Sequence, residues 1–370
     1  MKKLLIFHPT IAPYRIDFFN SLFEAFDTVV CLTNTNDQTF NYNEIYSKLQ
    51  FKPILLKCTH SLFGKCFFDE YRKWLDKFQP DIVVVGEFGI GTLLVLLYRL
   101  WKHKKYKILS ICDDSYNMLA ENNDFSKIHR LARRVLSPYL DEIIVVEPQT
   151  RDWYQNRYGK GICFPIIRKE DLQRKIYQKV LNKSIELQKK YAIENRNVFL
   201  FVGRLVALKN VKTLISSFSR LNRNENFLLI VGSGEEEHSL RQLTIDLELD
   251  NVLFTGRLEG EKLYAWYNVA DYFVLPSYLE AFGAVTNEAL LAGCYSLISN
   301  KAGSRCLIED GVNGFTFESM DVNELNEKMR LAIKKFPKIR PLNSVKPNLM
   351  SEIYAYDHSI RHIIRHMFEI

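Results

Sequence analysis

DYFVLPSYLEAFGAVTNEALLAG, residues 271–293, is the stretch of sequence that decides the fold. Tyr272–Leu275 is a short apolar run of strand-forming residues, and Pro276 ends it. Residues 284–292 combine a helix-favouring composition with apolar side chains at helical spacing. A buried strand, a polar turn and a helix therefore follow one another directly, and this is the unit from which parallel α/β sheets are built.

The turn between this strand and this helix carries groups suited to a phosphorylated sugar. Gly283 permits a ligand to approach the backbone closely, and the amide groups of Ala284 and Val285 at the helix start are free to bind a phosphate. Glu280 precedes the helix and Glu288 lies in it, and each carboxylate can accept hydroxyl hydrogen bonds from a sugar or a ribose. The alternative is that both are solvated surface acids.

Two cations flank another strand-to-helix turn upstream. Gly203 and Arg204 follow an apolar strand, and Lys209 precedes the next helix, so positive charge is expected where a diphosphate would lie. The alternative is a pair of solvated loop cations. The next strand ends in a glycine turn, where Gly234 lets the backbone pass close to a nucleotide.

Several segments around these residues form one recognisable series. ExFGxxxxE at residues 280–288 follows Pro-Ser and precedes EALLAGCYSLIS, and further segments are FVGRLVALKN at 201–210, LLIVGSGEEEHSL at 228–240, VLFTGRL at 252–258 and GVNGF at 311–315. The series resembles that of the family-4 retaining glycosyltransferases, and it covers nearly all of the second half of the chain. The resemblance implies a GT-B fold, in which two Rossmann-like, doubly wound α/β domains face a cleft.

The resemblance also implies roles for individual residues. In that family, residues at the positions of Arg204 and Lys209 grip the diphosphate of the donor. Glu280 would hold hydroxyl groups of the donor sugar, and Glu288 would bind the ribose. Backbone groups around Leu258 would hold the base. Arg204, Lys209 and Glu280 are accordingly the predicted catalytic residues of the second half.

The first half matches the family only in outline. Its first strand leads into HPTIAPYR at residues 8–15, where many family members carry paired glycines. We expect Arg15 to compensate by reaching the donor phosphate, and the alternative is a surface ion pair. Asp113 and Asp114 follow a later strand, at a place where α/β folds present side chains to ligands. We take Asp114 as a candidate catalytic residue, although either aspartate could face the cleft or cap the next helix.

The length of 370 residues exceeds what one core usually supports, so two domains are expected. Strands alternate with helices in both halves, which favours doubly wound α/β sheets. We predict an acceptor-binding domain at 1–168, a helical connection at 169–195, a nucleotide-sugar domain at 196–345 and a C-terminal helix at 346–370 that returns to the first domain.

The net charge of +7 is placed unevenly along the chain. Lys and Arg outnumber Asp and Glu by 22 to 18 in residues 1–165 and by 8 to 4 in 166–195, but number 20 against 21 in the rest. Two helical stretches at 91–107 and 127–136 combine apolar residues with basic clusters, so either core helices with basic ends or contacts with an anionic membrane are expected. No zinc-finger, RRM or helix-turn-helix pattern supports a nucleic-acid partner.

Motifs that would indicate metals or disulfides are not found. The seven cysteines are scattered and contain no CxxC pair, and no DxD or HExxH sequence occurs, so reduced thiols and no metal or other cofactor are expected. We therefore predict a metal-independent, retaining hexosyltransferase in the cytoplasm or at the inner face of the membrane. It would use a nucleoside diphosphate sugar and a saccharide or polyprenyl-linked acceptor in polysaccharide or lipopolysaccharide synthesis. The alternatives are a sugar-nucleotide epimerase of the same fold and a non-catalytic donor-binding subunit.

Overall fold

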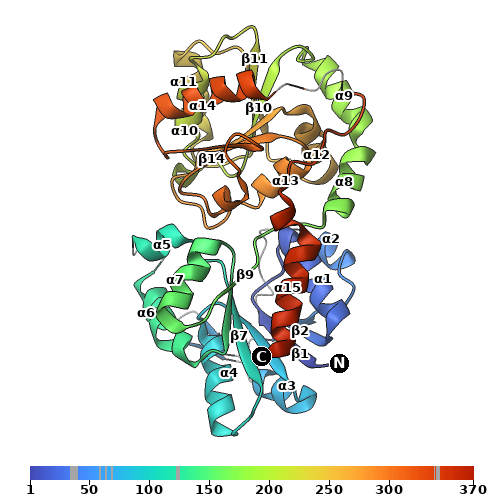
Figure 1. Ribbon diagram of the computed structural model, residues 1–370, viewed down its shortest axis with the longest axis vertical. Coiled ribbons are helices and arrows are strands. Elements are labelled where there is room, and N and C mark those ends of the chain that lie inside the picture. Colours follow the sequence, from blue (N-terminus) through green and yellow to red (C-terminus); the bar gives the residue numbers. More distant parts are fainter. Residues whose placement is uncertain are drawn as a thin grey trace. The chain divides into compact units, whose positions relative to one another are not determined.

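The computed structural model describes residues 1–33, 41–57, 60–62, 65–67, 70–121, 126–336, 338 and 342–370. The chain forms two compact units (Figure 1). The first comprises residues 1–166 and 357–370, and the second comprises residues 167–356. The first unit thus contains both ends of the chain, whereas the second is one continuous segment.

A seven-stranded parallel sheet forms the centre of the first unit, in the order β3-β2-β1-β6-β7-β8-β9. Its central strands are almost wholly apolar and buried, as is typical of parallel strands covered on both faces. The strands are β1 (Lys3–His8), β2 (Asp27–Leu32), β3 (Ile54–Leu55), β6 (Ile82–Gly86), β7 (Lys107–Cys112), β8 (Glu142–Val145) and β9 (Ile162–Cys163), with β4 (His60–Leu62) and β5 (Lys65–Phe67) as a separate antiparallel pair.

Helices cover both faces of this sheet. One face packs its buried side chains against α3, α4, α5, α6 and α7 in a single hydrophobic core. The helices are α1 (Ile16–Ala25), α2 (Tyr42–Ser47), α3 (Glu70–Phe78), α4 (Ile90–Trp101), α5 (Tyr116–Ala120), α6 (Lys127–Leu136) and α7 (Pro148–Tyr158), with short 3-10 turns η1 (Pro13–Arg15) and η2 (Ser137–Tyr139). The helix α4 ends at Trp101 rather than continuing to residue 107, and α6 has the predicted bounds.

A six-stranded parallel sheet, in the order β12-β11-β10-β13-β14-β15, forms the centre of the second unit. Its strands are β10 (Asn197–Val202), β11 (Asn226–Val231), β12 (Val252–Gly256), β13 (Tyr272–Leu275), β14 (Tyr295–Ser299) and β15 (Gly314–Phe317). Its helices are α8 (Glu170–Lys179), α9 (Leu181–Lys190), α10 (Val211–Phe218), α11 (Glu237–Asp246), α12 (Gly260–Val269), α13 (Val285–Leu291) and α14 (Val322–Lys335), with 3-10 turns η3 (Ala207–Lys209), η4 (Gly303–Leu307) and η5 (Glu352–Tyr354).

The segment predicted as a connection, residues 169–195, belongs to the second unit. The amide nitrogen of Asn268 in α12 donates to the backbone oxygen of Tyr177 in α8, at 2.8 Å, and to Ser184 Oγ in α9, at 3.2 Å. The ring of Tyr191 packs on Trp266 with centroids 5.5 Å apart. These contacts make α8 and α9 an outer layer of the second unit.

The last helix, α15 (Tyr356–Glu369), lies with the first unit apart from its first residue. His366 Nε2 lies 2.7 Å from Glu142 Oε2, and the ring of Phe368 stacks on Phe26 at 4.6 Å between centroids. The helix begins ten residues later than the start of the predicted segment at 346. Lys346 is instead buried in the second unit, where Nζ donates to the backbone oxygen of Ala270.

Candidate active site

Glu280, in the turn after β13, contacts Lys209 at the end of η3. All four residues of β13 are buried, and its bounds are those predicted. Lys209 Nζ donates to Glu280 Oε2, and Ser277 Oγ donates to the same oxygen at 3.4 Å. The two side chains of the ion pair are only 16% and 15% exposed. The sequence placed these two residues in separate turns, and the structure unites them at the carboxyl end of the sheet.

Gly283 fits its position for two reasons. Its φ angle is +93°, a backbone conformation that side-chain-bearing residues rarely adopt. A Cβ atom there would also lie 2.6 Å from Leu275 Cδ2, 3.1 Å from Ser304 Oγ and 3.4 Å from Glu280 Cγ. The glycine therefore allows the loop of Glu280 to pack closely on the end of β13.

Two glycine turns pack against each other beside this loop. A Cβ on Gly232 would lie 1.8 Å from the backbone oxygen of Gly203, and one on Gly234 would lie 2.3 Å from that of Leu205. The backbone nitrogen of Gly203 donates to Val231 O at 3.0 Å. These glycines permit contact between two backbone turns, which is a structural requirement in addition to the predicted approach of a nucleotide.

Arg204 and Leu258 lie in the turns that follow β10 and β12. Arg204 is exposed, and it forms no ion pair within the part of the chain that the structure describes. Leu258 is half-buried and packs on the core of the second unit. Arg204 is thus available to an anionic ligand, while the predicted contact of Leu258 with a base stays a prediction.

The amide groups at the start of α13 are partly used by the protein itself. The amides of Thr286 and Asn287 donate to the backbone oxygens of Gly283 and Ala284, at 3.0 and 3.1 Å. Among the described residues, no backbone acceptor is found for the amides of Ala284 and Val285. These two are the amide groups that the sequence singled out for phosphate.

Glu288 lies in a polar network and not on the surface. Its side chain is 14% exposed, Arg168 Nη1 lies 3.3 Å from Oε1, and the hydroxyl of Tyr267 donates to Oε2 at 3.2 Å. Burial and, secondarily, the charge of Glu288 raise the pKa of Tyr267 well above its usual value. Arg168 also donates to the hydroxyl of Tyr264 at 3.0 Å. The predicted role in ribose binding therefore involves a carboxylate that already has two protein partners.

Arg15 in the first unit is buried, which differs from the alternative of a surface ion pair, and its expected contact with the donor phosphate stays a prediction. Its side chain is 4% exposed, and Nη2 pairs with Asp113 Oδ1. Arg15 Nη1 is also buried and has no hydrogen-bond partner among the described residues. Leaving a buried guanidinium nitrogen unsatisfied is costly, so this atom is a candidate contact for an anionic ligand.

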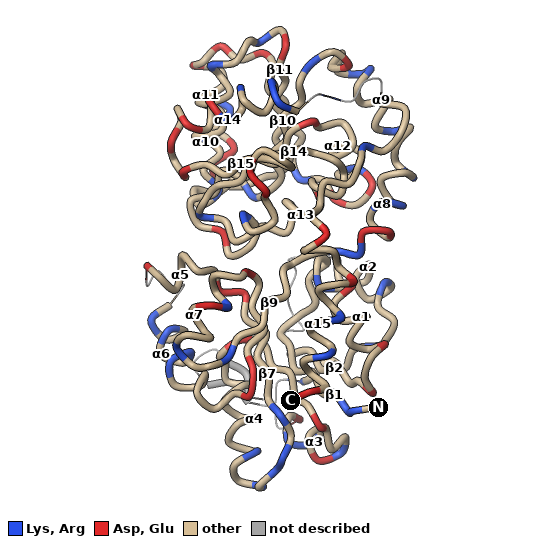
Figure 2. The backbone as a smooth tube through the Cα atoms, viewed as in Figure 1, with Lys and Arg blue, Asp and Glu red and all other residues tan. Residues whose placement is uncertain are grey.

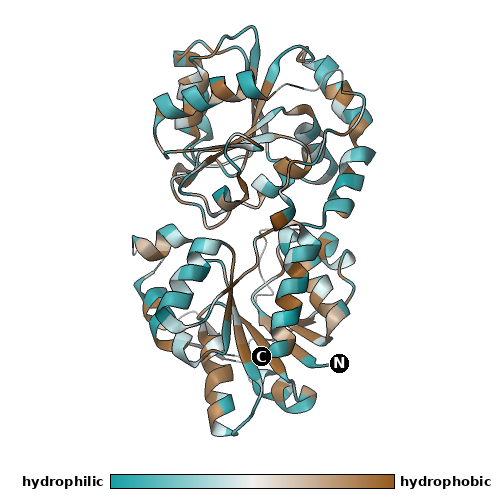
Figure 3. Ribbon diagram, in the orientation of Figure 1, coloured by the Kyte–Doolittle hydropathy of each residue, from teal (hydrophilic) through white to brown (hydrophobic). Residues whose placement is uncertain are grey.

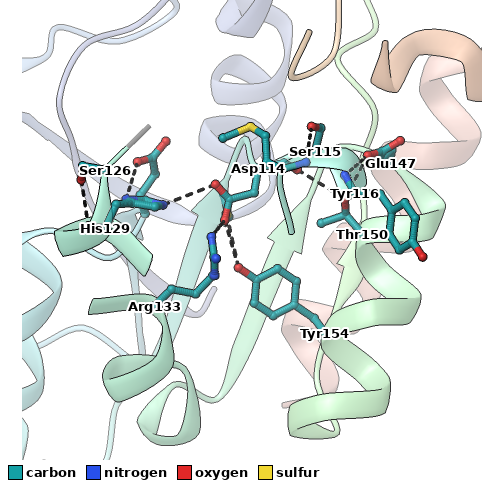
Figure 4. A network of polar contacts seen from close by, with 12 residues as sticks. Asp114, Ser115, Tyr116, Ser126, His129, Arg133, Glu147, Thr150 and Tyr154 are labelled. Atoms are coloured by element: carbon teal, nitrogen blue, oxygen red, sulfur yellow. Dashed lines mark hydrogen bonds and ion pairs between the residues drawn. The ribbon is translucent and has the colours of Figure 1, made fainter. Parts of the chain in front are cut away.

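Asp114 is the buried centre of a network of polar side chains (Figure 4). Arg133 Nη1 lies 2.9 Å from Oδ2, the hydroxyl of Tyr154 donates to Oδ2 at 3.2 Å, and His129 Nε2 lies 3.3 Å from Oδ1. Burial raises the pKa of Asp114, but the contact with His129 and the charge of Arg133 outweigh it and leave the pKa below its usual value. Both oxygens of Asp114 thus have protein partners, and its predicted catalytic role stays a prediction. Asp113 is the exposed member of the pair, at 39%.

Glu87 is a further candidate for the site, and the sequence did not single it out. It lies at the end of β6 with φ of +53°, and its backbone oxygen accepts from Thr92 Oγ1 at 2.8 Å and from Ser110 Oγ at 2.9 Å. Its half-exposed carboxylate lies 3.9 Å from His129 Nδ1. Partial desolvation by the neighbouring side chains, followed by the charges of Asp113 and Asp114, raises the pKa of Glu87 above its usual value, although half of the side chain is exposed. Strained residues that the surrounding structure holds in place often lie at functional sites.

Residues 183–341 match the family model described as glycosyl transferases group 1. This range contains Arg204, Lys209, Glu280 and Glu288. The chain is similar to glycosyltransferases. The first-unit candidates, among them Arg15, Glu87 and Asp113, lie outside the matched range.

Two relatives and one solved structure support this similarity. The uncharacterized glycosyltransferase MJ1607 of Methanocaldococcus jannaschii is 36% identical over 33% of this chain and 32% of its own length, so the chain spans about a third of that relative. An uncharacterized glycosyltransferase of Haemophilus influenzae is 28% identical over 74% of this chain and 75% of its own. The crystal structure of Anabaena Alr3699/HepE in complex with UDP and glucose has a TM-score of 0.77 at 16% identity and covers 100% of both chains. The predicted fold class, two Rossmann-like α/β units of the GT-B type, is confirmed.

Proposed function

We propose that this chain transfers a sugar from a nucleoside diphosphate sugar to a saccharide or lipid-linked saccharide. The observation that carries the proposal is the ion pair of Lys209 and Glu280 beside Gly283, within the range that matches group 1 glycosyl transferases. The Alr3699/HepE structure, which is of a complex with UDP and glucose, supports a nucleoside diphosphate sugar as donor.

The leaving diphosphate would be stabilised by positive charge from two turns. Lys209 has three N–H donors and gives one to Glu280, so the others are available to phosphate oxygens. Arg204 is exposed and can bind a phosphate with two parallel hydrogen bonds. Fixed cations directed at developing negative charge are usually the largest single contribution to catalysis.

The two glutamates would divide the recognition of hydroxyl groups. Lys209 and Ser277 fix the carboxylate of Glu280, whose second oxygen is then free to accept from the donor sugar. Each oxygen of Glu288 has one protein partner and retains a lone pair, so ribose hydroxyls would bind as additional donors. Arg168 and Tyr267 would then position Glu288 instead of competing with the ribose.

We further propose retention of the anomeric configuration, without a metal ion. The leaving phosphate would accept the proton of the incoming hydroxyl on the same face of the sugar, and Arg204 and Lys209 would supply the charge that a metal supplies elsewhere. Proton NMR of the glycoside product should show the same anomeric configuration at the new linkage as in the donor, with EDTA present throughout. An inverted product would contradict the proposed geometry of attack.

The acceptor would bind the first unit, where Arg15 Nη1, which has no hydrogen-bond partner among the described residues, lies beside the carboxylate of Asp113. An acceptor linked to a membrane lipid would fit the positive charge of this unit and place the reaction at the inner membrane face, in polysaccharide or lipopolysaccharide synthesis. Within the part of the chain that the structure describes, no helix is both long and apolar enough to cross a bilayer.

The first experiment measures binding of UDP, GDP, ADP and their common sugar conjugates by calorimetry, with EDTA present. One nucleotide should bind selectively. Lys209→Ala should weaken its binding by the ~1.5–3 kcal/mol typical of a charged hydrogen bond, about 10- to 150-fold in Kd. Glu280→Ala should abolish transfer while nucleotide binding persists, because its carboxylate contacts the sugar and not the nucleotide.

Lys212→Ala is the matched control, because Lys212 is an exposed lysine of the adjoining helix α10. It should bind the nucleotide as the unchanged chain does. Wild-type activity in both the Lys209 and the Glu280 variant would refute the assignment of the site. Consumption of the donor sugar without any acceptor, with release of an epimer, would favour an epimerase, and nucleotide binding without any turnover would favour a donor-binding subunit.

A further inference from the structure

The helix α6 presents an unusual surface to solvent. Three apolar residues, Ile128, Leu131 and Val135, are 68%, 62% and 52% exposed. Because a helix turns about 100° per residue, they fall within one sector of about 60°. Lys127, Arg130 and Arg134 fall within a neighbouring sector of about 60°, and the remaining face packs on the first unit. The exposed side of α6 is thus half apolar and half cationic.

A cavity of about 650 Å³ lies between the cationic sector of α6 and helix α7. Trp153 of α7 is in its wall, and two guanidinium groups lie over the indole ring, Arg157 at 5.4 Å and Arg133 at 5.8 Å from the ring centroid. The lining residues are Leu119, Ala120, Lys127, Arg130, Leu131, Arg133, Arg134, Trp153, Arg157 and Tyr158. Five cations therefore surround one cavity, and none of its described lining residues is acidic.

Part of this positive charge has no counter-charge among the residues that the structure describes. Arg133 is paired with the buried Asp114. Within the described residues, Lys127, Arg134 and Arg157 form no ion pair with a carboxylate. Cations gathered without acids repel one another, and a bound anion would remove that repulsion. Arg is also the residue best suited to a phosphate, because its guanidinium can bind two oxygens at once.

A second apolar stripe lies on the preceding crossover. On α4, Leu93, Leu97, Leu100 and Trp101 are 41%, 52%, 60% and 62% exposed, and lysines follow at residues 102, 104 and 105. Figure 3 shows α4 as strongly apolar, and Figure 2 shows basic residues on α6 and just beyond α4. Both helices cover the same face of the sheet, and Arg99 Nη2 of α4 donates to the backbone oxygen of Tyr139 after α6, at 2.6 Å.

We propose that the cavity between α6 and α7 binds the phosphate of an anionic phospholipid headgroup, while the apolar stripe of α6 enters the membrane interface. Exposed apolar residues beside cations match a membrane surface, where anionic headgroups cover an apolar interior. A soluble anion offers no such apolar region. In this arrangement Trp153 would lie at the interface between the lipid headgroups and water, where amphipathic aromatic rings are favoured. This proposal rests on the proposed location at the membrane. It adds a lipid-binding site whose occupation requires neither the donor nor the acceptor.

Flotation with vesicles of phosphatidylcholine, with and without phosphatidylglycerol, tests this inference on the full chain. The protein should float only with the anionic vesicles, and less at high salt. Arg134→Gln with Arg157→Gln should lower vesicle affinity about 25-fold, or about fivefold for each charge removed. Leu131→Ser should also weaken flotation, whereas Lys175→Gln with Lys189→Gln, exposed lysines of α8 and α9, should change it little.

Three outcomes would overturn the proposal. They are equal flotation with both kinds of vesicle, unchanged flotation of the double arginine variant, and equal losses in the double arginine and double lysine variants. Binding of soluble pyrophosphate is a further test. If pyrophosphate quenches the fluorescence of Trp153 while the protein binds no vesicle, the cavity binds a soluble phosphorylated ligand and not a lipid. Nucleotide calorimetry on the same samples separates this result from the proposed function, because its site lies in the second unit. Denaturant unfolding of each variant shows whether its first unit is folded.

Discussion

Adjacent residues can have opposite roles, as Asp113 and Asp114 show. Asp114 is enclosed by His129, Arg133 and Tyr154, whereas Asp113 is exposed and pairs with Arg15. Consecutive side chains after a strand point in different directions, so the sequence left open which of the two aspartates faces the cleft. The buried one is identified by its partners, which come from α6 and α7.

The contact of His129 with Asp114 should make stability depend on pH. Asp114 raises the pKa of His129 in the folded chain, so protonation stabilises the fold below the ordinary histidine pKa of about 6.5. That stabilisation is lost as the pH rises through the raised pKa. His129→Gln should therefore lower the free energy of unfolding at about pH 5.5 and change it little at about pH 9. Denaturant unfolding of the first unit at the two pH values measures the difference, and an equal loss at both would contradict the ion pair.

Elements built from local sequence were predicted better than contacts between distant segments. The strand β13 and the helix α6 have their predicted bounds, because apolar spacing and turn residues mark both ends of each. Lys209 and Glu280 were predicted individually, from a motif. The surroundings of Glu288 were not predicted, since Arg168, Tyr177 and Tyr267 come from three separate parts of the chain and no local pattern connects them.

The packed turns after β10 and β11 lead to a prediction about these elements. Gly232 has φ of +149°, and a Cβ there would meet the backbone oxygen of Gly203 at 1.8 Å. Gly232→Ala should therefore force the two turns apart and cost at least ~1–3 kcal/mol of stability. Gly256→Ala is a useful comparison, because Gly256 also has positive φ but no atom within 4 Å of the added carbon. Urea unfolding should show the larger loss for Gly232→Ala, and equal losses would show that backbone strain alone sets the cost.

At the scale of the whole molecule, the residues predicted to bind the donor and the features proposed to bind a membrane lie in different units. The donor candidates, Arg204, Lys209, Glu280 and Glu288, all belong to the continuous second unit. The exposed apolar faces of α4 and α6 and the cavity beside Trp153 belong to the first. Only the second unit carries motifs that the sequence alone could interpret, because its ligand contacts lie in short turns after strands.

The position of α15 determines the order in which the two units are completed during translation. The second unit, residues 167–356, is complete in the nascent chain before the residues that finish the first unit have been translated. Until Ile360, Ile363 and Met367 arrive, the apolar surface that they cover faces water. The unit that is translated first is therefore finished last, and its uncovered face is open to chaperones, or to aggregation, throughout the interval.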